Sequence, residues 1–202
     1  MLSACDAGNP ANLGSSVDVS GSLPPLAFTM RRASDGHEVT AADYRGKLVL
    51  LYFGYTSCPD VCPMTLSNLT TMLGRLGARS DQIRVLLVTI DPNRDNLGVL
   101  KQYTSSFALQ VDALRGTADQ LAALAKRYRV AYSVKPTPGS GGYEVTHSTG
   151  VYLFDKGGNV RRLFAGLESP APAGLDAMVQ DLRILLGTPP APGWLSRFMH
   201  SS

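Results

Sequence analysis

The sequence predicts an α/β fold: one layered domain with a mixed central sheet and helices on both faces. Its 202 residues exceed a typical domain only modestly, so one core is expected rather than two. Hydrophobic residues make up 44% of the chain and charged residues 17%, which suits a buried core. Short apolar runs of strand length alternate with longer segments of helical periodicity, as in layered α/β domains.

The central strand is predicted at residues 47–55 (KLVLLYFGY), an almost continuous apolar run typical of a strand buried on both faces. A helix is expected to open at Cys58 and Pro59, because apolar side chains then recur every three or four residues as far as Leu76. A second buried strand at residues 84–90 and a helix at 96–107 complete a βαβ unit.

The second half predicts a helix at residues 117–128, a short strand at 130–134 and a turn-rich loop at 136–142. Residues 150–155 and 160–164 flank a glycine turn and predict a β-hairpin, followed by a last helix at 173–186. An early βαβ unit with a terminal ββα unit is the plan of a thioredoxin-like three-layer sandwich. We expect an N-terminal β-hairpin as an extension of it.

The two ends differ from the middle. Residues 1–22 are rich in Ala, Gly, Ser and Asn without periodicity, which predicts a flexible tether. A Pro- and Gly-rich break precedes a short tail at 188–202, so the folded domain is expected at residues 23–187. The net charge is only +3 and basic residues do not cluster, which argues against a nucleic-acid partner.

The cysteines are Cys5, Cys58 and Cys62, an odd number for a disulfide scaffold. Cys58 and Cys62 lie four residues apart where a strand turns into a helix, so both are expected on one face of the first helical turn. Pro59 suits the first helical position, and the free amides and dipole of a helix start favour thiolates. Such a pair can close a disulfide or hold a soft metal.

Three histidines are available as further ligands. His37 lies in a turn signature and His200 in the tail, so both are expected to be exposed surface residues. His147 follows the glycine-rich loop, which in a thioredoxin-like sheet reaches the same end as the cysteine helix. Its position alone allows either a ligand or an ordinary loop histidine.

Three segments resemble, in this order, the SCO/SenC family of copper-binding thioredoxin-fold proteins. They are GYTSCPDVCPMTLSNL (54–69), VTIDPNRDN (88–96) and VTHSTGVYLFDKGGNV (145–160), and the resemblance covers about residues 23–187. It implies a mononuclear copper site with Cys58 and Cys62 as thiolate ligands and His147 as the imidazole ligand. Two thiolates suit Cu(I), and an added imidazole allows the site to hold Cu(II) as well.

The resemblance also implies a function. It is that of a metallochaperone that delivers copper to the binuclear copper centre of cytochrome c oxidase, or that reduces the cysteines of that centre before copper enters. The implied partners are the copper-centre subunit of the oxidase, together with another periplasmic copper chaperone or a thioredoxin-like reductant.

Two features near the motifs qualify this interpretation. Asp91 and Asp95 at the end of the second strand predict turn caps, although the resemblance implies that an aspartate here supports the copper site or a partner surface. Neither is expected to be a ligand. Thr146 stands where the family often has Asp, which removes a carboxylate that could accept a hydrogen bond from the histidine.

The main alternative is a thiol-disulfide oxidoreductase, in which Cys58 or Cys62 attacks a partner disulfide and the other resolves it without metal. Thioredoxin-like enzymes of that kind usually carry CxxC and a cis-proline before the facing strand, and Ser148-Thr149-Gly150 offers no proline. A peroxidase is a more remote option, because the second cysteine is not at the usual resolving position. The sequence leaves open whether the protein is an enzyme.

The start of the chain predicts a location. Residues 2–5 (LSAC) resemble a bacterial lipobox, in which the cysteine becomes the lipidated first residue, and Asp6 resembles a signal for retention at the inner membrane. We therefore expect an extracytoplasmic protein at the periplasmic face of the bacterial inner membrane, anchored through a lipid on Cys5.

Overall fold

A mixed sheet forms the centre of the molecule. The computed structural model describes residues 16–138, 142–172 and 174–187. Across this part of the chain the main sheet runs, from edge to edge, through β1 (Ser16–Asp18), β10 (Val160–Phe164), β9 (Val151–Phe154), β4 (Leu48–Gly54), β5 (Ile83–Thr89), β6 (Val111–Arg115), β2 (Thr29–Arg32) and β3 (Glu38–Thr40). β5 pairs in parallel with both β4 and β6, and the other neighbours are antiparallel.

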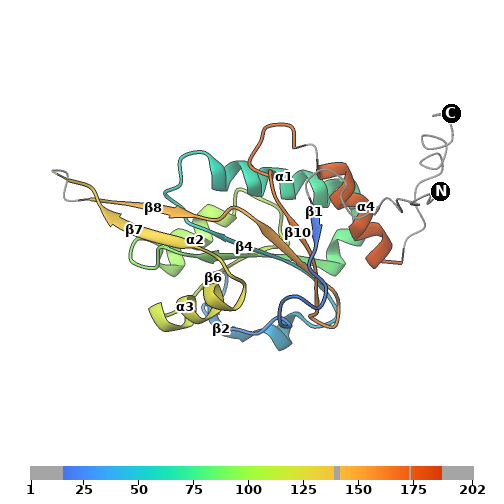
Figure 1. Cartoon of the computed structure of the whole chain (residues 1–202), viewed down its shortest axis with the longest axis horizontal. Coiled ribbons are helices and arrows are strands. Elements are labelled where there is room, and N and C mark those ends of the chain that lie inside the picture. The colour runs from blue at the N-terminus through green and yellow to red at the C-terminus, as the bar shows by residue number, and fades with distance from the viewer. Residues whose placement is uncertain (1–15, 139–141, 173, 188–202) are drawn as a thin grey trace, which may run out of the picture.

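Helices cover the sheet on two sides, as predicted. α1 (Val61–Leu76) and α4 (Leu175–Leu185) pack together on one side, and α3 (Ala118–Arg127) lies on the other (Figure 1). α2 (Leu97–Thr104) packs beside β6, and the short 3-10 helices η1 (Ala41–Tyr44) and η2 (Gly77–Gln82) connect strands and helices. Every residue of β4 is buried, which confirms the predicted central strand. None of the described helices combines the length and apolar character that a bilayer crossing needs.

A second, two-stranded sheet projects from this body. β7 (Tyr132–Pro136) and β8 (Tyr143–His147) form an antiparallel pair separate from the main sheet, and Figure 1 shows it extending beyond the helices. Its register places Tyr132 opposite His147, so the base of the hairpin adjoins the body. This hairpin carries the candidate histidine.

The predicted elements are largely confirmed, with differences at four strands. β7 begins at residue 132 rather than 130, and β8 and β6 were not expected. β6 is only five residues long and contains the polar Asp112, so it lacks the apolar run that marks β4 and β5. Residues 16–18, which the sequence predicts as tether, pair with β10 as the edge strand β1, so the sheet begins before residue 23. Residues 1–15 of the predicted tether and the tail 188–202 lie outside the described residues.

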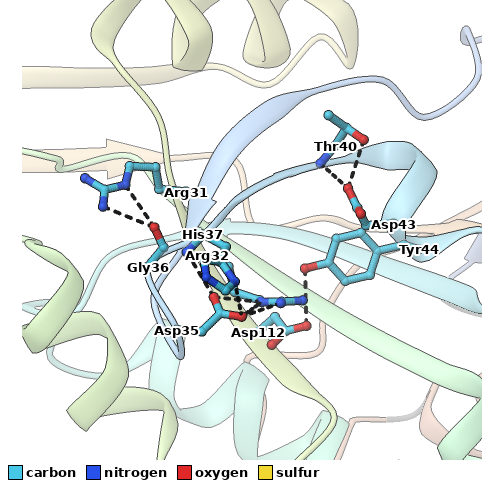
Figure 2. A network of polar contacts seen from close by, with 9 residues as sticks. All are labelled: Arg31, Arg32, Asp35, Gly36, His37, Thr40, Asp43, Tyr44 and Asp112. Atoms are coloured by element: carbon cyan, nitrogen blue, oxygen red, sulfur yellow. Dashed lines mark hydrogen bonds and ion pairs between the residues drawn. The ribbon is translucent and has the colours of Figure 1, made fainter.

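The expected N-terminal β-hairpin is present as β2 and β3, at the edge opposite β1. Figure 2 shows the polar network around its turn, where Arg32 Nε lies 3.2 Å from both Asp35 carboxylate oxygens and Nη2 forms an ion pair with Oδ2. The Tyr44 hydroxyl donates to Asp112 of β6 at 3.3 Å. Burial raises the pKa of Asp112, a partly buried residue of β6. The contact therefore connects η1 to the sheet. The network stabilises this edge of the sheet.

Candidate metal centre

The three predicted ligands come together at one end of the sheet. Cys58 lies in the loop after β4, Cys62 in the first turn of α1, and His147 at the end of β8. One ligand atom from each lies within 4.8 Å of the other two. Bonds of about 2.3 Å to sulfur and 2.0 Å to nitrogen, as at zinc, place two ligands of one ion roughly 3.5–4 Å apart. Small side-chain movements therefore suffice for all three to bind one ion.

The helix start differs from the prediction. α1 begins at Val61 after the N-cap Asp60, so Pro59 and Cys58 precede the helix and only Cys62 lies in its first turn. The backbone amide of Cys62 nevertheless donates to the Cys58 Sγ at 3.4 Å. The Cys58 sulfur, which lies just outside the helix, thus accepts a hydrogen bond from one of the free amides at the helix start.

The two sulfurs have different surroundings. Cys58 is partly exposed, whereas Cys62 is fully buried. Burial raises the pKa of Cys62 to about 12, even though the Tyr52 hydroxyl and the Tyr55 backbone amide favour its thiolate through hydrogen bonds. The expectation that the helix start makes both sulfurs thiolates is therefore wrong for Cys62, because desolvation outweighs the nearby donors. Without metal, Cys62 is a neutral thiol at physiological pH.

His147 is oriented as a metal ligand. Its Nδ1 lies 2.8 Å from the Ser148 carbonyl oxygen, which can only accept, so Nδ1 carries the proton. Nε2 then has a free lone pair, and it lies 3.5 Å from the Cys62 Sγ. Burial lowers the pKa of His147, which favours the neutral imidazole that metals bind. The rings of Tyr52 and Tyr55 pack edge to face against it, with centroids 6.1 and 5.9 Å away.

Side-chain contacts fix the hairpin that carries His147. The Tyr55 hydroxyl donates to the Val145 carbonyl at 3.1 Å, and the Tyr143 hydroxyl donates to the Asp91 Oδ1 at 2.6 Å. The Arg94 guanidinium lies 4.1 Å above the Tyr143 ring and pairs with Asp91. Residues 143, 145 and 147 alternate along β8 and so share the face toward the body.

The aspartates do more than cap turns. The backbone carbonyl of Asp91 accepts the amides of Arg94 and Asp95, as a turn requires, but both carboxylates are buried and reach other segments. Asp95 accepts from the Thr56 amide and hydroxyl, at 3.1 and 2.5 Å, and from the Thr89 hydroxyl at 2.6 Å. It thereby braces the loop that leads to Cys58. Neither aspartate belongs to the ligand cluster, as expected.

The remaining candidates are placed as follows. His37 is largely exposed in the β2–β3 turn, as predicted. Cys5 and His200 lie outside the described residues. Thr146 contacts Ser133 across the hairpin at 2.9 Å. The Ser148 carbonyl, rather than a side chain at residue 146, accepts the hydrogen bond from His147 Nδ1.

Sequence reasoning gave no role to the tyrosines near the site. The available signal was the alternation in 143–147 (YEVTH), which puts Tyr143 and His147 on one face. For Tyr52 there was no signal, because a tyrosine in a buried strand resembles any other core residue.

The comparisons agree with this geometry. A model of the SCO1/SenC family matches residues 27–182. The mitochondrial SCO2 homolog of Bos taurus is 39% identical over 119 residues, which are 58% of this chain and 45% of that protein. The chain thus spans less than half the length of this curated relative.

Two solved structures are similar over most of the described fold. Bradyrhizobium japonicum ScoI with copper bound is 31% identical with a TM-score of 0.68, over 78% of this chain and 98% of that one. Yeast Sco1 with copper bound is 32% identical with a TM-score of 0.68, over 89% of this chain and 97% of that one. Because the family model covers well over half of the sequence, the chain belongs to the SCO1/SenC family.

Proposed function

We propose that this protein binds one copper ion through Cys58, Cys62 and His147 and passes it on as cargo. The observation that carries the proposal is the convergence of two sulfurs and one imidazole nitrogen within 4.8 Å. Thiolates favour Cu(I), and the imidazole lets the same site accept Cu(II). The copper-bound structures of ScoI and yeast Sco1 support this choice of metal.

The donor set favours copper over structural zinc. Structural zinc sites have four protein ligands, whereas the cluster within the described residues offers three. Three ligands suit an ion that must leave again, because a thiolate of the acceptor can bind before the donor ligands release it. The partly exposed Cys58 is the sulfur that an acceptor reaches first. Cys62, at the buried end, releases the ion last.

The acceptor that we propose is the copper-centre subunit of cytochrome c oxidase. This proposal rests on family membership and on the resemblance of the three motif segments. Another copper chaperone is the proposed donor, and a thioredoxin-like protein the proposed reductant of the cysteine pair. Metal binding needs both cysteines reduced, so a reductant must act before copper arrives.

We also propose an extracytoplasmic location at the inner membrane with a lipid on Cys5. The lipobox-like residues 2–5 support it. Mass spectrometry of the protein purified from membranes tests the anchor: the expected result is a diacylglycerol adduct on Cys5. An unmodified Cys5 in that fraction would contradict it.

Copper transfer is the experiment that tests the function. The reduced chain is given one equivalent of Cu(I), mixed with the metal-free soluble copper-centre domain of the oxidase subunit, and separated from it. We expect the acceptor to gain copper faster from this protein than from a small Cu(I) chelator of similar affinity. A Cys58→Ser variant should bind copper more weakly and transfer it without this acceleration.

A version of the same assay distinguishes copper transfer from the alternative function, thiol-disulfide exchange without metal. The acceptor domain is prepared with its cysteines as a disulfide, and the reduced, copper-free chain is added. Rapid appearance of acceptor thiols, with formation of the Cys58–Cys62 disulfide, would identify a thiol reductase. If copper transfer is absent as well, the metallochaperone proposal fails.

A further inference from the structure

A buried tyrosine hydroxyl lies against the buried sulfur. Tyr52 is in β4 at the centre of the sheet and is 0% exposed. Its hydroxyl donates to the Cys62 Sγ at 3.4 Å, a contact within the side-chain core rather than at the surface. A buried tyrosine hydroxyl normally finds a partner, and here that partner is a proposed copper ligand.

The backbone leaves room for this contact through a glycine. A Cβ at Gly54 would lie 3.0 Å from the Cys62 Sγ and 3.0 Å from the Tyr52 ring. Tyr52 and Gly54 are two residues apart in β4 and so face the same side of the sheet. The missing side chain at Gly54 therefore permits the approach of Tyr52 to Cys62.

Tyr52 also touches the histidine. Its ring packs edge to face against His147, with centroids 6.1 Å apart. One side chain on a fully buried strand thus contacts two of the three proposed ligands. Because β4 is buried at the centre of the sheet, the Tyr52 hydroxyl is already positioned against Cys62 before any ion is bound.

A hydrogen bond to a thiolate ligand changes its electron donation to the metal. The sulfur carries more negative charge on Cu(I) than on Cu(II), because Cu(II) withdraws more of its electron density. A donor therefore stabilises the Cu(I) form more, and hydrogen bonding at the cysteine sulfur is a known means of tuning copper sites.

We propose that Tyr52 is a positioning residue that acts through Cys62: its O–H···S bond shifts the preference of the site toward Cu(I). The inference rests on the proposed copper function. It adds an explanation of how the protein favours one oxidation state of the bound copper. The Cys58 sulfur instead accepts the backbone amide of Cys62, so the two sulfurs have different hydrogen-bond donors.

The test compares Tyr52→Phe with a matched control. Tyr152→Phe also removes one buried hydroxyl, which donates to the Tyr128 carbonyl at 2.7 Å. Tyr152 pairs with Leu51 of β4, so its side chain lies on the opposite face of the sheet from that of Tyr52. Both variants lose a comparable hydrogen bond, but only one loses the bond to sulfur.

Two readouts are measured on the copper-bound protein. Cu(I) and Cu(II) affinities are obtained by competition with chelators specific for each ion, and the thiolate-to-Cu(II) charge-transfer band is recorded. In Tyr52→Phe we expect the Cu(I)/Cu(II) affinity ratio to fall about tenfold and the band to move to longer wavelength. Tyr152→Phe should keep both values. Circular dichroism and urea unfolding verify that both variants fold.

The outcomes separate the two proposals. If the wild-type chain binds no copper, the proposed function fails and the inference fails with it. If the wild type binds copper but Tyr52→Phe keeps its affinity ratio and band, only the inference is overturned. Equal shifts in Tyr52→Phe and Tyr152→Phe would also overturn it, because they would reflect general loosening of the core.

Discussion

At the scale of single residues, the positions of the protons on His147 and Cys62 determine which atoms are free to bind a metal. His147 holds its proton on Nδ1 toward Ser148, which leaves Nε2 free, and burial keeps Cys62 as a thiol facing that nitrogen. A copper ion entering here displaces the thiol proton from Cys62. Cys62 and His147 are thus both neutral before the metal arrives, and Cys62 becomes charged when it binds the ion.

The raised pKa of Cys62 predicts a pH dependence of stability. Its value in the fold is about 12 against 9.0 for an ordinary thiol, so between these limits the unfolded chain loses a proton that the folded chain keeps. The free energy of unfolding should therefore fall as pH rises from about 9 to about 12, by at most about 1.4 kcal/mol per pH unit. Urea unfolding of the reduced, metal-free protein at pH 8 and pH 10 measures it.

The control for this pH effect is Cys62→Ala, which has no thiol to titrate. Its stability should decline less than that of the wild type over the same interval. An equal decline in both proteins would show that Cys62 is not the group responsible.

Gly54 offers a second residue-scale prediction. In Gly54→Ala the new Cβ meets the Cys62 Sγ, the Tyr52 ring and Leu87 at 3.0–3.1 Å, so we expect a loss of about 1–3 kcal/mol in the free energy of unfolding. Gly74→Ala is the matched control, because its Cβ meets nothing within 4 Å in α1 and should stabilise by about 0.5–1 kcal/mol. Chemical denaturation checks both, and a neutral Gly54→Ala would contradict the tight packing around Cys62.

At the scale of elements, the β7–β8 hairpin decides whether the site is complete. It brings His147 to cysteines about 85 residues earlier in the chain, and it reaches the body through Tyr55 and Val145 and through Tyr143 and Asp91. The position of the third ligand therefore depends on how firmly one projecting element is held.

Removing one hydroxyl tests this dependence. Tyr143→Phe loses the hydrogen bond to Asp91 while keeping the ring under Arg94. We expect Cu(II) affinity to fall several-fold and the amides of β8 to exchange hydrogen faster, since the hairpin loses a partly buried contact with the body. Thr146→Val, on the outer face of the same strand, should leave both unchanged. Identical behaviour of the two variants would show that the Asp91 contact does not hold the hairpin.

The sequence predicts the elements that have a strong pattern. β4, β5, α1 and the β9–β10 hairpin follow from long apolar runs, helical periodicity and a glycine turn. β1, β6 and β8 are three to five residues long, and their place depends on partners far along the chain, such as Phe164 for Ser16. A short strand is defined by its pairing, which a local pattern does not record.

At the scale of the whole molecule, the fold unites segments that the sequence keeps apart. Composition and spacing indicate a reactive cysteine pair, and the motif resemblance adds His147 and copper. The resemblance implied a supporting aspartate, but the contacts of Tyr52 and Arg94 could not be predicted, because they arise from tertiary structure. The sequence and the resemblance therefore predicted the three residues that the fold brings together, but not the surroundings of each sulfur.

The central claim is that Cys58, Cys62 and His147 together hold one copper ion. The most direct measurement is titration of the fully reduced protein with Cu(I) and Cu(II), beside His147→Ala, with stoichiometry and thiolate-to-copper charge transfer as readouts. We expect one ion per wild-type chain and, in His147→Ala, at least a tenfold loss of Cu(II) affinity with a smaller loss for Cu(I). Absence of copper uptake by the reduced wild type, or equal Cu(II) affinity in the variant, would contradict the account.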